Sequence, residues 1–184
     1  MIVTIGGDIG SGKTTVAKAL AERFHIENIS AGEAFRAMAQ ERGMSLAEFS
    51  KLAEEDHTLD RELDKKQVQL VKAAKDVVVD GRLSGLLLQS EADLKIWLRA
   101  PLEVRAKRVS GREKKDFRQV LEETREREES ELKRYKEIYQ IDLRDLSPYD
   151  VILNTELWGS EEIINIIGNM ISLLSKGAGS HGCR

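Results

Sequence analysis

The feature that most constrains this chain is a glycine-rich segment near its start. Residues 7–14 read G-D-I-G-S-G-K-T and match G-x-x-x-x-G-K-[ST], a pattern whose backbone N–H groups surround a polyphosphate. In this pattern Lys13 reaches the β and γ oxygens, and the hydroxyl of Thr14 binds Mg²⁺. An apolar strand, 2–5, precedes the segment, and residues 14–24 carry apolar side chains at helical spacing. Because both flanking elements are present, we interpret the segment as a phosphate-binding loop at a helix N-terminus rather than a chance turn.

The composition fits one globular domain and argues against several classes of protein. The chain has 184 residues, and its net charge of −3 disfavours a general nucleic-acid or membrane-surface binder. Its single cysteine, Cys183, excludes an internal disulfide, and together with His181 it offers too few ligands for a metal site. The sequence has neither a signal-peptide pattern nor an apolar run that could span a bilayer, so we expect a cytoplasmic protein.

Short apolar segments alternate with helical patterns along the chain. Such alternation is typical of a three-layer α/β fold, in which helices cover both faces of a parallel sheet. The bounds of the segments follow from their apolar residues and from the turn residues that flank them. The expected strands are residues 2–5, 26–29, 77–79, 94–98 and 150–153.

Two segments are interpreted as insertions into this α/β core. The first covers about residues 31–68 and contains Ser45 and Glu48, a capping-box pattern that begins a new helix. The second covers about residues 111–136 and is dense in charges of both signs. The core is then expected to comprise residues 1–30, 69–110 and 137–174, followed by a flexible, glycine-rich tail at 175–184.

The phosphate-binding loop alone fits GTPases, motor ATPases and kinases, and other features narrow the choice. The chain lacks the N-K-x-D sequence that reads guanine in GTPases, and it is short for a large ATPase. Asp80 ends an apolar strand, where such enzymes place the acid that holds Mg²⁺ or its waters; the alternative is a cap or turn residue. Several arginines follow the expected strands and suggest a second phosphate group, because arginine forks onto phosphate oxygens: Arg36, Arg82, Arg105, Arg108, Arg112, Arg127 and Arg134.

The motifs together resemble those of nucleoside monophosphate kinases, and most of all the archaeal-type cytidylate kinases. Residues 30–36 (S-A-G-E-A-F-R) and 80–85 (D-G-R-L-S-G) are similar to motifs after the second and third strands of adenylate kinases. Residues 108–112 (R-V-S-G-R) are similar to the R-x-x-x-R at their lid entrance. Residues 127–134 (R-E-E-S-E-L-K-R) resemble a bacterial cytidylate kinase motif that has Asp where this chain has Glu131. The resemblance covers nearly the whole chain apart from the tail.

The resemblance implies a sheet order of 2-3-1-4-5 and a role for each insertion. The first insertion would bind the nucleoside monophosphate, and the second would form a lid. Catalysis would fall to Lys13, Arg82, Arg127 and Arg134. ATP would contact Gly7, Asp8, Ile9, Gly10, Ser11, Gly12, Lys13, Thr14 and Thr15, with Arg108 near adenine and Arg112 at the phosphates. The acceptor would contact Ser30, Gly32, Arg36, Asp60, Arg61, Asp64, Gln67, Gly81, Arg82 and Glu131, while Thr14 and, through water, Asp80 would hold Mg²⁺.

The absence of an obvious catalytic base in the sequence fits an acceptor that is itself a phosphate. A phosphate monoester has a second pKa of about 6 and is already anionic at neutral pH, so no group need remove a proton from it. Alignment and charge stabilisation then suffice. Lid closure would exclude water and suppress ATP hydrolysis.

The identity of the acceptor base rests on fewer residues. Leu83 stands where bacterial cytidylate kinases have a cytosine-reading Asp, and Ala31 stands where adenylate kinases have Thr. We therefore assign recognition of the base to the helical stretch 59–67, where the candidates are Asp60, Arg61, Asp64 and Gln67. The alternative is that this stretch is an exposed charged helix with no role in binding. We expect CMP as the acceptor, with dCMP and UMP as secondary substrates. The alternatives are another acceptor, such as AMP or a phosphorylated metabolite, and a non-catalytic nucleotide-binding switch. A monomer is expected.

Overall fold

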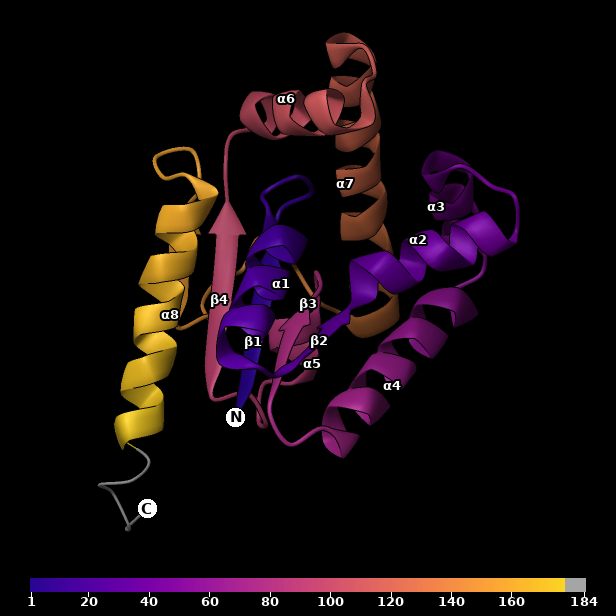
Figure 1. Cartoon of the computed structure of the whole chain (residues 1–184). Coiled ribbons are helices and arrows are strands. Elements are labelled where there is room, and N and C mark those ends of the chain that lie inside the picture. The colour runs from indigo at the N-terminus through magenta and orange to yellow at the C-terminus, as the bar shows by residue number, and fades with distance from the viewer. Residues whose placement is uncertain (178–184) are drawn as a thin grey trace.

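Five parallel strands form the centre of the molecule in the computed structural model, which describes residues 1–177 (Figure 1). Their order in the sheet is β2-β3-β1-β4-β5, which confirms the order that the resemblance implied. β1 pairs with β3 on one side and with β4 on the other, so the phosphate-binding loop leaves the middle of the sheet. The strands are β1 (Ile2–Gly7), β2 (Glu27–Ser30), β3 (Val77–Asp80), β4 (Leu94–Arg99) and β5 (Val151–Asn154).

Helices pack around the sheet, and two groups of them project beyond it (Figure 1). α6 and α7 lie at the top in this view, and α2, α3 and α4 lie to the right. The helices are α1 (Lys13–Phe24), α2 (Ala31–Glu41), α3 (Leu46–Glu55), α4 (Thr58–Ala73), α5 (Ser84–Leu87), α6 (Leu102–Glu113), α7 (Phe117–Tyr139) and α8 (Ser160–Gly177).

The sheet is buried on both faces, which explains its nearly continuous apolar strands. On one face Val78 joins Leu20 of α1 and Ile167 of α8 in the largest buried cluster. On the other face its neighbours along β3, Val77 and Val79, pack with apolar residues of α4 and of the segment after α5. Successive side chains of a strand point to opposite faces, so this division follows directly from the chain. The predicted three-layer architecture is confirmed.

The first insertion has a small hydrophobic core of its own. Phe49 of α3 is fully buried and packs with Ala39 of α2 and Leu59 of α4. The predicted capping box begins α3: Glu48 N–H donates to Ser45 Oγ at 3.2 Å, and Ser45 N–H donates to Glu48 Oε2 at 2.8 Å. The insertion is therefore a packed unit that can present α2 and α4 to one side of the site.

The second insertion consists of the end of α6 and most of α7. Lys114, at a φ of 54°, ends α6, and Asp116 accepts hydrogen bonds from two backbone N–H groups to begin α7. α7 packs against α6 and also against α3, where Lys133 Nζ lies 3.4 Å from Glu54 Oε2. α7 therefore spans the space above the phosphate-binding loop and contacts the first insertion.

The end of the chain differs in part from the expected tail. Residues 175–177, assigned to the tail from their glycine content, continue helix α8 to Gly177. The rest of the predicted tail, with His181 and Cys183, lies outside the described residues. Within residues 1–177, no helix combines the length and the apolar character that a membrane crossing requires.

Candidate active site

The phosphate-binding loop has the backbone conformation that its glycines allow. Gly10 and Gly12 have φ values of 77° and 98°, a region that favours glycine because it has no Cβ. Gly12 is the N-cap of α1, so the loop delivers its N–H groups to the positive end of a helix dipole. A polyphosphate bound here would meet backbone donors and a favourable field.

The side chain of Lys13 folds back onto this loop. Its Nζ donates hydrogen bonds to the carbonyl oxygens of Gly7 and Asp8, both at 2.9 Å. Burial, and next the positive charge of Arg82, lower the pKa of Lys13 to about 8. Arriving phosphate oxygens would stabilise the ammonium form and offer stronger partners than these carbonyls.

Asp80 forms a polar contact at the end of β3 with groups from two other elements. Its Oδ1 accepts hydrogen bonds from the hydroxyls of Thr14 at 2.9 Å and Ser30 at 3.1 Å. Asp80 is almost fully buried, and its Oδ2 has no hydrogen-bond partner among the described residues. Burial raises the pKa of this carboxyl group above its usual value. An unsatisfied buried carboxylate oxygen beside a threonine hydroxyl is a candidate partner for a hydrated cation.

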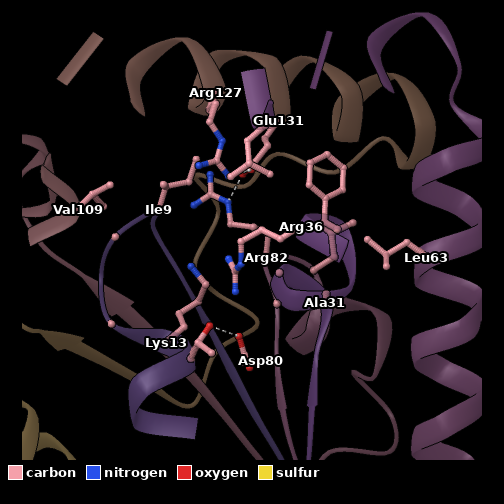
Figure 2. Close-up of a pocket in the computed structure, with 18 of the residues that line it drawn as sticks. Ile9, Lys13, Ala31, Arg36, Leu63, Asp80, Arg82, Val109, Arg127 and Glu131 are labelled. Carbon is pink, nitrogen blue, oxygen red and sulfur yellow. Dashed lines mark hydrogen bonds and ion pairs between the residues drawn. The ribbon is translucent and has the colours of Figure 1, made fainter. Parts of the chain in front are cut away.

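Two of the predicted catalytic arginines share one carboxylate. Arg82 Nε lies 2.5 Å from Glu131 Oε2, and Arg127 Nη2 lies 4.0 Å from Glu131 Oε1. Burial opposes the ionisation of Glu131, but the positive charges of Arg82, Arg127, Arg134 and Lys13 outweigh it and hold its pKa below the usual value. Figure 2 shows Arg127 and Glu131 projecting from α7 toward Lys13 and Asp80 at the other side of the cavity. Glu131 thus balances the positive charges of Arg82 and Arg127 at the cavity.

The third predicted catalytic arginine, Arg134, is held by a different carboxylate. Its Nε lies 2.8 Å from Asp60 Oδ2, and both side chains are 2% exposed. Asp60 was predicted to read the acceptor base, but its carboxylate is engaged by Arg134 and does not line the cavity. Arg61, another predicted base reader, is exposed and lies outside the cavity lining. Of the four candidates on α4, Asp64 and Gln67 are those that face the cavity.

The arginines of α6 have separate surroundings. Arg105 is buried; it donates to the carbonyls of Ala100 and Ile9 at 2.7 and 2.8 Å and pairs with Glu128 at 2.7 Å. It therefore supports the phosphate-binding loop from behind. Arg108 donates to the hydroxyl of Thr155 at 2.8 Å, which places it at the loop after β5 and outside the cavity.

One cavity collects most of the predicted site residues, and they come from both insertions and the core (Figure 2). The predicted residues that line it are Ile9, Gly10, Gly12, Lys13, Thr14, Thr15, Gly32, Arg36, Asp64, Gln67, Asp80, Gly81, Arg82, Arg112, Arg127, Glu131 and Arg134. The predicted residues that do not line it are Gly7, Asp8, Ser11, Ser30, Asp60, Arg61 and Arg108. The cavity thus combines a phosphate-binding loop, a buried acid and several cations.

Comparison with known proteins shows which family has this arrangement. Residues 2–157 match the model of the cytidylate kinase-like family. The chain belongs to this family. Cytidylate kinase from Methanocaldococcus jannaschii is 49% identical over 179 residues, which cover 96% of this chain and 100% of that protein. Cytidylate kinase from Methanocella arvoryzae is 47% identical over 176 residues, covering 96% and 99%. The predicted resemblance is confirmed.

Solved structures bear out the fold of this cytidylate kinase-like chain. An uncharacterized protein from Eubacterium ventriosum matches with a TM-score of 0.68 at 20% identity, covering 94% of this chain and 98% of that one. Shikimate kinase from Acinetobacter baumannii, in complex with shikimate, matches with a TM-score of 0.59 at 16% identity, covering 92% of each chain. At these identities the likeness concerns the fold alone.

The apolar residues of this kinase-like cavity could not be recognised from the sequence. Phe35, Leu46 and Leu63 line it from α2, α3 and α4, and Val109 and Tyr135 line it from α6 and α7. In the sequence these residues fit the apolar spacing of helix interiors, so nothing distinguished them from core residues. Their position at the cavity depends on how the two insertions pack against each other.

Proposed function

We propose that this protein is a cytidylate kinase, which transfers the γ-phosphoryl group of ATP to CMP and yields ADP and CDP. The observation that carries the proposal is the convergence of a phosphate-binding loop with Arg36, Arg82 and Arg127 on one cavity. The phosphate-binding loop suits a triphosphate, and the arginines suit a second phosphate that faces it. The whole-length similarity to proteins named cytidylate kinase supports CMP as the acceptor.

The donor would bind at the phosphate-binding loop with Mg²⁺ beside it. The residues fit such an ion: Asp80 Oδ2 is buried and has no partner within residues 1–177, and the hydroxyl of Thr14 donates to the other oxygen of the same carboxylate. Magnesium prefers oxygen ligands and retains waters, so a threonine hydroxyl, phosphate oxygens and a water held by Asp80 suit it. When bound, the ion would neutralise charge on the β and γ phosphates.

The protein groups would then align and stabilise the transfer. Lys13 would exchange its two loop carbonyls for phosphate oxygens of the donor. Arg36 and Arg82 would hold the acceptor phosphate, and Arg127 would face the charge that develops between the two nucleotides. For this, Arg82 must loosen its contact with Glu131, which an incoming phosphate dianion can compensate. The cytoplasmic location and the monomeric state stay predictions.

A panel of acceptors tests this function. ADP release is measured with ATP and Mg²⁺ alone and then with CMP, dCMP, UMP, AMP or GMP. We expect turnover that requires an acceptor and is fastest with CMP. A clear preference for AMP would show that AMP, and not CMP, is the acceptor. Tight ATP binding without acceptor-stimulated turnover would indicate a nucleotide-binding switch instead.

Arg36 offers a direct test of the acceptor phosphate site. We expect Arg36→Ala to raise the KM for CMP about 10- to 100-fold, because a charge-assisted hydrogen bond to a buried anion is lost. The affinity for ATP alone should stay within about twofold, since the phosphate-binding loop offers the triphosphate its own backbone donors and Lys13. Steady-state kinetics with CMP varied, together with calorimetric ATP binding, measure the two effects.

Arg42→Ala is the matched control, because it removes the same charge from the end of the same helix. Arg42 does not line the cavity; its Nη1 donates to the carbonyl of Met38 at 3.2 Å. Its removal should leave the KM for CMP unchanged. Equal effects of both substitutions would place the acceptor phosphate elsewhere.

A further inference from the structure

The cavity has cations in its middle and apolar side chains at two opposite edges. Figure 2 shows Leu63 at one edge and Ile9 and Val109 at the other, with Lys13, Arg82 and Arg127 between them, where phosphates would bind. The edge at Leu63, on α4, is called here the apolar side. A nucleotide that places its phosphate among the cations would direct its base toward this apolar side, where ring faces can pack against side chains.

Two hydrogen-bonding groups of α4 face the cavity beside this apolar side, and both offer acceptors. Asp64 Oδ2 accepts a hydrogen bond from the Tyr139 hydroxyl at 2.6 Å; its Oδ1 has no hydrogen-bond partner within residues 1–177. The amide nitrogen of Gln67 donates to the carbonyl of Asp80 at 3.4 Å, and its amide oxygen has no hydrogen-bond donor among the described residues. Gly81 keeps this wall open, because a Cβ there would lie 2.9 Å from Ala31 Cβ and 3.4 Å from Gln67 Nε2.

We propose that Asp64 determines the base specificity of the acceptor site by accepting a hydrogen bond from the exocyclic amino group of cytosine. The proposal rests on the proposed function and assigns its selectivity to one residue. The Tyr139 hydroxyl occupies one carboxylate oxygen and so directs the other toward the ligand. An ionised carboxylate is an acceptor only, which matches an amino group that is a donor only.

Uracil presents the opposite polarity at the same position. Its O4 is an acceptor, so the free oxygen of Asp64 would face another oxygen lone pair. A site built for a donor rejects an analogue without it, because its own buried acceptor is then left unpaired. Both pyrimidine nucleotides carry the same phosphate and can carry the same sugar. Discrimination by Asp64 should therefore appear as a difference between the kcat/KM values for CMP and UMP, and not as an equal loss of activity with both.

The competing explanation is that Asp64 only ties two helices together. Asp64 lies on α4 and Tyr139 on α7, so their hydrogen bond also joins the first insertion to the lid segment. A purely structural tie would affect all acceptors in proportion. The ratio of kcat/KM for CMP to kcat/KM for UMP, called here the selectivity ratio, separates the two explanations.

The central experiment replaces Asp64 by asparagine in the full-length chain. Asparagine keeps the shape of the side chain, and its amide can turn its NH₂ toward uracil O4. We expect the selectivity ratio to fall about tenfold or more, through both a lower kcat/KM for CMP and a higher one for UMP. Glu62→Gln, an exposed position on the same helix, removes the same charge and should leave the ratio unchanged.

The pH dependence of the ratio is a second measurement. The pKa of Asp64 is raised to about 6. Burial is the largest cause and Asp60 on α4 also raises it, while the Tyr139 hydroxyl and Arg134 on α7 partly offset them. Below this pH a neutral carboxyl group can donate to uracil O4, so the wild-type ratio should rise as the pH increases from about 5.5 to 7.5. The acceptor phosphate also titrates in this range, but equally for both nucleotides, so it cancels from the ratio.

Tyr139→Phe keeps the test decisive if the asparagine variant does not fold. Loss of a hydroxyl that favours the ionised carboxylate should move the midpoint of the pH profile to higher pH. An unchanged ratio in a folded Asp64→Asn variant overturns the proposal. If that variant does not fold, an unmoved midpoint in Tyr139→Phe overturns it. If instead the wild type does not phosphorylate CMP, the proposed function itself fails, which is a distinct result.

Discussion

Replacing Lys13 by methionine is expected to lower kcat for phosphoryl transfer about 10³-fold. The ammonium group of Lys13 lies within the phosphate-binding loop, where it can follow the charge of the γ-phosphoryl group during transfer. Methionine keeps most of the side-chain length but has no charge and no donor. The affinity for CMP alone should change little, because we propose that Arg36 and Arg82, not Lys13, hold the acceptor phosphate. Single-turnover kinetics with saturating ATP and CMP measure the chemical step directly.

Lys18→Met provides the matched control on the same helix. Lys18 is exposed and pairs with Glu33 at 2.6 Å at the protein surface. Because surface ion pairs contribute little, this variant should keep its kcat within about twofold and its stability within about 1 kcal/mol. A Lys13→Met variant that retained a tenth of the wild-type rate would contradict the role of Lys13 in the transfer.

Replacing Asp60 by leucine is expected to lower the free energy of unfolding by about 3–5 kcal/mol. The substitution leaves the guanidinium group of Arg134 buried without its carboxylate partner, and an uncompensated buried charge is strongly destabilising. Arg134 retains the hydroxyl of Ser130 at 2.8 Å, which offsets only part of that loss. Urea denaturation monitored by circular dichroism measures the effect.

A double variant separates the ion pair from the packing around it. Asp60→Leu with Arg134→Met removes both charges, so it should cost less than Asp60→Leu alone. Lys133→Ala is the surface control, on the same helix as Arg134. It removes the contact with Glu54 and should lower the free energy of unfolding by no more than about 1 kcal/mol. A loss below 1 kcal/mol for Asp60→Leu would show that the buried pair is not essential to the fold.

The same pair shows where prediction from sequence succeeds and where it stops. Asp60, Asp64 and Gln67 are four and three residues apart and share a face of α4, whereas Arg61 points away and is exposed. This much follows from helical spacing. The spacing cannot reveal which residue of α7 meets each of them, because α7 lies far along the chain. Arg134 engages Asp60 and Tyr139 engages Asp64, and these contacts decide which side chains face the cavity.

The sheet and the phosphate-binding loop were more predictable because their signals are local. The strand–loop–helix order around Lys13 and the alternation of apolar strands with helices determine most of the α/β core. The arginines were recognised as a group, but their individual partners were not. Arg105, for example, holds the phosphate-binding loop in place. It donates to the carbonyls of Ala100 and Ile9, and Ile9 becomes its neighbour only in the folded chain.

α7 is tied by buried or half-buried contacts both to the core and to the first insertion. Glu131 and Glu128 reach Arg82 and Arg105, while Arg134 and Tyr139 reach α4. Any motion that admits or frees a nucleotide by lifting α7 must part at least one of these pairs. If the second insertion moves as the proposed lid, the contacts that position the arginines would also hold it closed, and the frequency of their opening would limit how fast substrates and products exchange, independently of the speed of the transfer itself.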